Sequence, residues 1–129
     1  MAGILGIGGV FFLAEDGDAI RDWYRDVLGF NIEDWGGAMF QHPDRGYTVW
    51  SPFKADSTYF APSTLPFMIN LIVDDMDAVL AKAADAGVTP LGRDDSDASG
   101  RFAWLLDPAG IKIELWQPPA GAVAAPVPA

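Results

Sequence analysis

The feature that most constrains this chain is a pattern that occurs twice. Residues 9–30 and residues 68–88 each contain an apolar strand-like run, an acidic cluster, an Asp-Ala pair opening a helical pattern, and a glycine closing it. Two later segments also match each other, Thr48–Pro52 (TVWSP) and Glu114–Pro118 (ELWQP). A repeated half-domain cannot bury its apolar face alone. We therefore expect the two copies to pack together and to form a cleft where they meet.

Each copy predicts the element order βαβββ. In the first copy, Asp16 or Gly17 caps a helix whose apolar residues recur on one face, and Gly29 ends it. The strands predicted in this copy are Ile4–Leu13, Phe30–Trp35, Ala38–Gln41 and Tyr47–Trp50. The second copy predicts a helix from Met76 to about Ala86 and an acidic loop over Arg93–Gly100. Its predicted strands are Phe67–Val73, Val88–Leu91, Arg101–Leu106 and Ile111–Gln117.

These elements predict a single α+β domain. It comprises module 1 (about residues 4–50), a proline-containing linker (51–66), module 2 (67–117) and a Pro/Ala-rich tail (118–129). A chain of 129 residues is the size of one domain, and half of its residues are apolar. The two βαβββ modules are expected to form a curved mixed sheet around a cleft.

Charge and composition exclude several classes of partner. Eight basic and eighteen acidic side chains give a net charge of −10, which disfavours nucleic acid and anionic membranes as partners. A cationic or neutral small ligand is compatible with this charge. The chain has no cysteine, so disulfides and thiol chemistry are excluded. The sequence shows neither a signal peptide nor a membrane-spanning run, so we expect a cytoplasmic protein.

Three motifs resemble the vicinal oxygen chelate superfamily, which includes glyoxalase I, extradiol dioxygenases and bleomycin-resistance proteins. They are Asp22–Phe30 (DWYRDVLGF), Val73–Ala78 (VDDMDA) and Asp107–Trp116 (DPAGIKIELW). The resemblance covers about residues 4–118. It implies the glyoxalase/bleomycin-resistance fold of two βαβββ modules. It also implies a homodimer, because such proteins are commonly dimers whose grooves are completed across the subunit interface.

Metal-dependent members of the superfamily place His, Glu or Gln ligands on the first and last strands of each half. By this resemblance, the corresponding positions are Gly9, Thr48, Met68 and Glu114. Only Glu114 is a strong ligand for a hard cation, because glycine has no side chain and a thioether is soft. The single histidine, His42, falls in a predicted loop. We therefore expect no metal and no other cofactor.

Glu114 is the one candidate catalytic residue. Alternation along its strand places Lys112, Glu114 and Trp116 on one face, and the resemblance implies that this face lines the cleft. Glu114 is then a general base, or it is a structural carboxylate that pairs with Lys112 or with the backbone. Asn70 is expected on the same side, where it can hydrogen-bond a ligand or Glu114.

Aromatic side chains recur on separate predicted strands and suit a planar, hydrophobic or cationic ligand. The alternative is that they fill the groove. Together with Asn70, the candidate ligand-binding residues are Phe11, Trp35, Phe40, Trp50, Phe102, Trp104 and Trp116.

Three functions remain open at this point. The first is a metal-independent small-molecule-binding protein, similar in kind to bleomycin-resistance proteins, that sequesters an aromatic or cationic ligand. The second is a glyoxalase-like lyase, isomerase or epimerase that uses Glu114 as general base. The third is a regulatory or interaction module. Whether the protein is an enzyme is left open.

Overall fold

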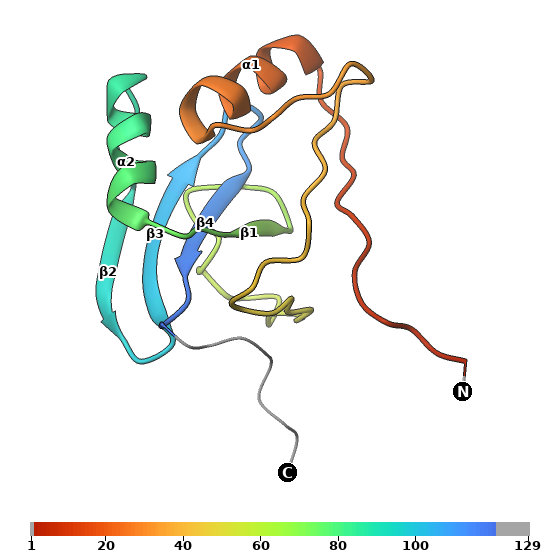
Figure 1. Ribbon diagram of the computed structural model, residues 1–129, viewed down its shortest axis with the longest axis vertical. Coiled ribbons are helices and arrows are strands. Elements are labelled where there is room, and N and C mark those ends of the chain that lie inside the picture. The colour runs from red at the N-terminus through yellow and green to blue at the C-terminus, as the bar shows by residue number, and fades with distance from the viewer. Residues whose placement is uncertain (1, 121–129) are drawn as a thin grey trace.

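The computed structural model describes residues 2–120, which form two helices and a four-stranded mixed sheet (Figure 1). The elements in chain order are α1 (Gly17–Leu28), β1 (Met68–Ile72), α2 (Met76–Asp85), β2 (Gly92–Asp97), β3 (Gly100–Leu106) and β4 (Lys112–Gln117). The strand order across the sheet is β1-β4-β3-β2. β1 runs parallel to β4, whereas the β4–β3 and β3–β2 pairs are antiparallel. This arrangement is the α+β class predicted from the sequence.

Both helices begin and end close to their predicted limits. The carboxylate of Asp16 accepts a hydrogen bond from the backbone N–H of Ala19 at the start of α1, and Asp75 does the same for Ala78 in α2. Gly29 ends α1 in the left-handed conformation with φ of 73°, which glycine adopts without a steric penalty. The helix signals in the two copies are local, and both were therefore readable from the sequence.

The predicted second copy folds as a βαβββ unit, with one correction. We expected a strand at Val88–Leu91 and a loop over Arg93–Gly100, but β2 lies at Gly92–Asp97, within that acidic stretch. Arg93 offsets the local negative charge by pairing with Asp77 and Asp95. Because β2 is an edge strand whose side chains are largely exposed, it carries charges that a central strand would exclude.

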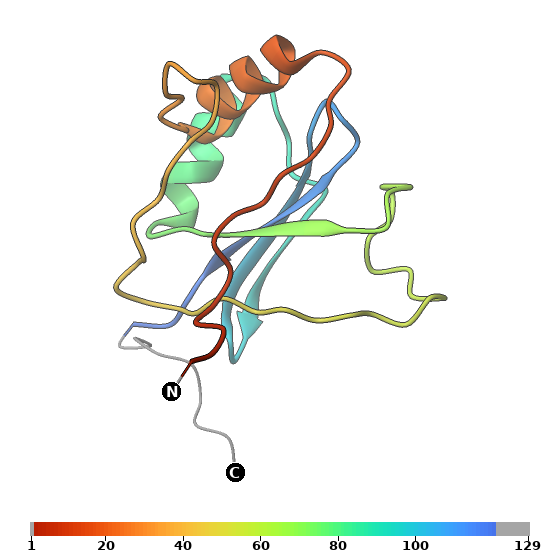
Figure 2. The ribbon, with the colours of Figure 1, turned by 90° about the vertical axis from the view of Figure 1, so that its right-hand side faces the viewer.

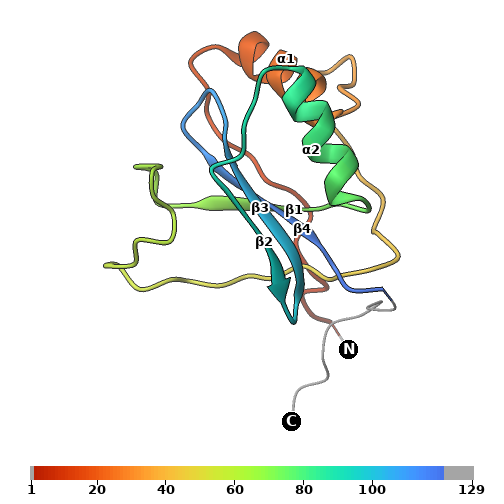
Figure 3. The same cartoon turned by 90° about the vertical axis from the view of Figure 1, so that its left-hand side faces the viewer.

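The core lies between the two helices and one face of the sheet (Figures 2 and 3). Ile113 and Leu115 of β4 are at most 1% exposed and face this core. Tyr24 of α1 donates a hydrogen bond to Asp107, which also accepts from the backbone N–H groups of Ala109 and Ile111. This buried contact attaches the helix of the first half to the β3–β4 turn of the second half.

The predicted first-half strands are not formed within this chain. Within residues 2–120, the helix α1 is the only regular element before β1. Residues 2–13 and 38–53 make no backbone–backbone hydrogen bond with any described residue, and Figures 1 and 2 show them as extended coil outside the sheet. A strand exists only with a paired neighbour, and the folded chain provides none for these segments. The two-module arrangement and its boundaries therefore remain predictions.

Two further expectations concern the ends of the chain and membranes. The predicted Pro/Ala-rich tail falls largely on residues 121–129, which lie outside the described residues. Neither α1 nor α2, the helices described within residues 2–120, has the length and apolarity needed to cross a bilayer.

Candidate functional site

Glu114 lies at the centre of the sheet and is held by three side chains. β4 runs between β1 and β3, and the strand register places Asn70 and Trp104 directly opposite Glu114 on its two sides. Asn70 Nδ2 donates to one carboxylate oxygen at 2.7 Å. Trp104 Nε1 donates to the other at 2.8 Å, and the hydroxyl of Tyr59 donates to that same oxygen. Glu114 is 8% exposed. Three neutral donors therefore replace the water that this carboxylate loses on burial.

Lys112 lies two residues before Glu114 but does not pair with it. Its ammonium donates a hydrogen bond to the backbone carbonyl of Tyr59 at 2.6 Å. It also lies 5.0 Å from the centroid of the Tyr59 ring and 5.8 Å from that of the Trp104 ring, within cation–π range. Among the described residues, no lysine or arginine nitrogen lies within 4.0 Å of the Glu114 carboxylate. Neither predicted structural role, pairing with Lys112 or with the backbone, is thus observed.

Tyr59 is a member of this site that sequence reasoning missed. It lies in the segment predicted to be a linker, 55 residues before Glu114, and that segment has neither helix nor strand. Burial raises the pKa of its hydroxyl to about 12, and the hydrogen bond to Glu114 acts in the same direction. The segment shows no periodicity, so the sequence contains no signal that could place this side chain beside β4.

Three aromatic rings form a ladder on the same face as Glu114. Phe102 stacks on Trp104 with ring centroids 6.3 Å apart, and on Trp116 with centroids 6.5 Å apart. The planes of both pairs are within about 11° of parallel. The indole N–H of Trp116 donates to the carbonyl of Ser99 at 2.8 Å, which fixes the end of the ladder. Of the predicted ligand-binding residues, Asn70, Phe102, Trp104 and Trp116 are thus brought together with Glu114.

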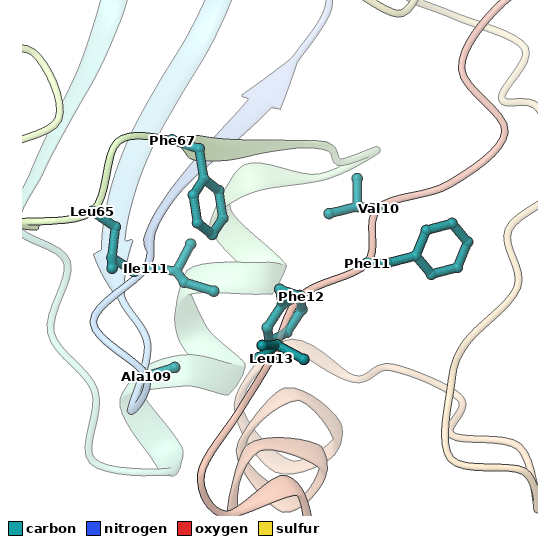
Figure 4. Close-up of a pocket in the computed structure, with 8 residues that line it drawn as sticks. All are labelled: Val10, Phe11, Phe12, Leu13, Leu65, Phe67, Ala109 and Ile111. Atoms are coloured by element: carbon teal, nitrogen blue, oxygen red, sulfur yellow. The ribbon is translucent and has the colours of Figure 1, made fainter.

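The other predicted ligand-binding residues do not join this cluster. Their side chains are mostly exposed to solvent: Phe11 is 92% exposed, Trp35 67%, Phe40 67% and Trp50 80%. Phe11 instead borders a cavity of about 350 Å³ between Val10–Leu13 and the apolar side chains of Leu65, Phe67 and Ile111, with its ring directed away from them (Figure 4). That cavity includes neither Glu114 nor the aromatic ladder.

The donor set does not fit the metal that the superfamily implies. Both oxygens of Glu114 already accept hydrogen bonds from neutral side chains, and the neighbouring Met68 offers only a thioether, which suits soft metals. Residues 2–120 contain no group of three or more His, Cys, Asp or Glu arranged to hold an ion. His42 is exposed in a loop.

Comparison with known proteins is consistent with this architecture. The glyoxalase-like domain family matches residues 9–116, which is most of the chain. The chain belongs to this family. The match, with the solved structures below, places it in the superfamily that its motifs resemble. No curated protein matches the chain significantly.

Solved structures share the fold of this glyoxalase-like domain. TnmS3, an antibiotic binding protein from Streptomyces sp. CB03234, is 26% identical over 81% of this chain and 88% of its own, with a TM-score of 0.52. A glyoxalase/bleomycin resistance protein from the same organism is also 26% identical, over 81% and 93% of the two chains, with a TM-score of 0.51. A glyoxylase/bleomycin resistance protein/dioxygenase domain from Frankia sp. EAN1pec is 18% identical over 92% and 96%, with a TM-score of 0.58.

Proposed function

We propose that this glyoxalase-like domain is a metal-independent binding protein that sequesters a planar, cationic small molecule on the Glu114 face of its sheet. The observation that carries the proposal is the pairing of a buried carboxylate, lacking a cationic partner, with a ladder of parallel aromatic rings. The similarity to TnmS3, an antibiotic binding protein, supports a small molecule as the partner. In this proposal the domain comprises module 1 (about residues 4–50), a linker (51–66) and module 2 (67–117).

The preferred ligand class follows from the electrostatics. Glu114 is surrounded by neutral donors, so its negative charge is solvated but not neutralised. A ligand cation would gain Coulombic attraction in a partly water-excluded site, where such attraction is stronger than in bulk water. The faces of Trp104 and Phe102 would add cation–π and stacking contacts.

Tyr59 is the group that such a ligand would displace. Asn70 and Trp104 belong to the strands on either side of Glu114, whereas Tyr59 belongs to a segment without helix or strand and is 40% exposed. Its hydroxyl occupies one hydrogen-bonding position on the carboxylate. A ligand that donates to Glu114 would take this position, and the Tyr59 ring would then close over the ligand or move aside.

The contacts of Glu114 argue against its use as a general base in a lyase, isomerase or epimerase. A base must present a lone pair to the substrate proton. One oxygen of this carboxylate already accepts one hydrogen bond and the other accepts two, so a substrate proton would compete with three donors or displace Tyr59. Lys112 and Asn70, two of the groups that could stabilise an oxyanion, are bonded to the carbonyl of Tyr59 and to Glu114 itself.

Fluorescence titration tests the proposal with two probes of similar shape, the aromatic cation proflavine and the neutral ring acridone. We expect proflavine to bind more tightly and Glu114→Gln to weaken its binding by about tenfold or more, since hydrogen bonds to charged groups contribute about 1.5–3 kcal/mol. Glu15→Gln removes an exposed carboxylate and is the matched control. Tyr59→Phe should strengthen proflavine binding. Equal affinity of wild type and Glu114→Gln, with both folded, would rule out Glu114 as the ligand contact.

A further inference from the structure

The face of the sheet that carries Glu114 also carries a second buried charge, Lys112. The two residues are two positions apart on β4, so their side chains project to the same side, with their Cα atoms about 6.6 Å apart. Lys112 is 9% exposed, nearly as little as Glu114. Its ammonium can donate three hydrogen bonds, but among the described residues only the backbone carbonyl of Tyr59 accepts one. Within residues 2–120, neither charge has an oppositely charged partner within 4.0 Å.

Tyr59 contacts both of these charges, each from a different end of the residue. Its hydroxyl donates to the Glu114 carboxylate, and its backbone carbonyl accepts a hydrogen bond from the Lys112 ammonium at 2.6 Å. The ring that connects the two ends lies 5.0 Å from the ammonium and edge-on to Trp104, with ring centroids 6.4 Å apart. An aromatic ring with a donor at one end and an acceptor at the other therefore already occupies the site.

A ligand that displaces Tyr59 as a whole therefore removes a contact from both charges. Tyr59 belongs to a segment without helix or strand, so its hydroxyl and its carbonyl leave together when this segment moves. A ligand that offers only a cation replaces the donor to Glu114 but leaves Lys112 without an acceptor. A buried ammonium without an acceptor is unfavourable. A ligand that offers an acceptor as well restores both contacts.

We propose that the ligand is zwitterionic: a planar ring that carries a cationic donor at one end, which binds Glu114, and an anionic acceptor at the other, which binds Lys112. This inference rests on the function proposed above and narrows its ligand class. Without the ligand, Tyr59 fills both positions and acts as an internal substitute. Because one positive and one negative charge lie side by side, the site is complementary to a ligand with both charges rather than to a simple cation.

The test compares two probes that differ only at the end that would face Lys112. 4-(Aminomethyl)benzoate carries an ammonium and a carboxylate on opposite sides of one ring, and in 4-methylbenzylamine a methyl group replaces the carboxylate. NMR titration followed at the indole N–H of Trp104, which donates to Glu114, measures both affinities at the site. We expect the zwitterion to bind wild type about tenfold or more tightly than the amine. Lys112→Met keeps an unbranched side chain and should abolish this preference, whereas Lys82→Met, at an exposed position of α2, should retain it.

Different outcomes overturn the zwitterionic ligand and the proposed function. Amine binding that Glu114→Gln weakens, with no preference for the zwitterion or with a preference that Lys112→Met retains, would overturn the zwitterionic ligand and leave the proposed function intact. Binding of both probes that Glu114→Gln leaves unchanged, or no binding of either, would overturn both. The comparison in wild type needs no variant. Lys112→Met should bind the amine at least as tightly as wild type, because it removes a like charge, and this binding shows that the variant is folded.

Discussion

The segments that follow α2 and those that follow α1 differ in whether their backbone N–H and C=O groups are hydrogen-bonded to a neighbouring strand. After α2, the chain forms β2, β3 and β4, which pair with one another and bury Ile113 and Leu115 against the helices. After α1, the matching segments remain extended, unpaired and exposed. The two helices form in both halves because their caps and apolar faces are local. The comparison indicates that a strand-like sequence forms a strand only where a neighbouring strand is available to pair with it.

The same comparison explains why the site is concentrated in the second half. Asn70, Trp104 and Glu114 come from three neighbouring strands, and the strand register fixes their positions. The first-half aromatic residues lie on segments that have no strand pairing to fix their positions. From the predicted linker, Tyr59 reaches the sheet and hydrogen-bonds Glu114.

The largest difference should come from truncating two apolar residues at matching positions of the repeat, one in each half. Leu115 and Val49 occupy equivalent places in the ELWQP and TVWSP segments, but Leu115 is 1% exposed and Val49 65%. Leu115→Ala should lower the free energy of unfolding by about 2–5 kcal/mol, since it leaves a cavity in the core. Val49→Ala should change it by less than about 0.5 kcal/mol in dilute protein. Urea unfolding followed by circular dichroism measures both, and equal losses would show that the two halves are packed alike.

A smaller effect is expected from cutting the hydrogen bond that links the halves. Burial, reinforced by the bond to Asp107, raises the pKa of Tyr24 far above its ordinary value. Tyr24→Phe removes a donor from a carboxylate that is 4% exposed. It should destabilise the protein by about 1–3 kcal/mol. Tyr47→Phe is the control, because the Tyr47 hydroxyl makes no hydrogen bond with the described residues. Similar unfolding midpoints for the two variants would mean that the Tyr24–Asp107 contact does not attach α1.

The smallest effect is the contribution of Tyr59, in the predicted linker, to the pH dependence of the unfolding free energy. The pKa of Tyr59 rises on folding from 10.0 to about 12, so the folded state retains a proton that the unfolded state releases. The stabilisation is complete below pH 10 and is lost as the pH rises through 10 towards 12. Tyr59→Phe should therefore flatten the decline in unfolding free energy over this range, although Tyr24 will maintain part of it. An unchanged slope in the variant would contradict the burial of the Tyr59 hydroxyl against Glu114.

The elements whose signals are local could be predicted from the sequence, and so could the face on which a side chain of a strand lies. The caps at Asp16 and Gly29, the alternation that places Glu114 opposite the core, and the Asn70–Glu114 contact could all be predicted from spacing. The position of β2 could not, because its acidic sequence is tolerated only through Arg93 and its place at an edge.

Two aspects of the site were beyond sequence reasoning for a different reason. Tyr59 reaches Glu114 through the path of an irregular segment, which no periodicity specifies. The first-half aromatic residues were expected in one groove with the second-half ones, because matching sequence was taken to imply matching strands. These residues are exposed, and their segments have no paired neighbour. A repeated sequence therefore forms matching strands only where each strand has a neighbour to pair with.

Isothermal titration of proflavine into the wild-type protein and Glu114→Gln, each with EDTA and with added Zn²⁺, shows whether Glu114 holds a cationic ligand without a metal. We predict the same affinity for wild type in both conditions, and about tenfold or more weaker binding by Glu114→Gln in both. Binding that appears only with Zn²⁺, or that Glu114→Gln leaves unchanged, would contradict the account.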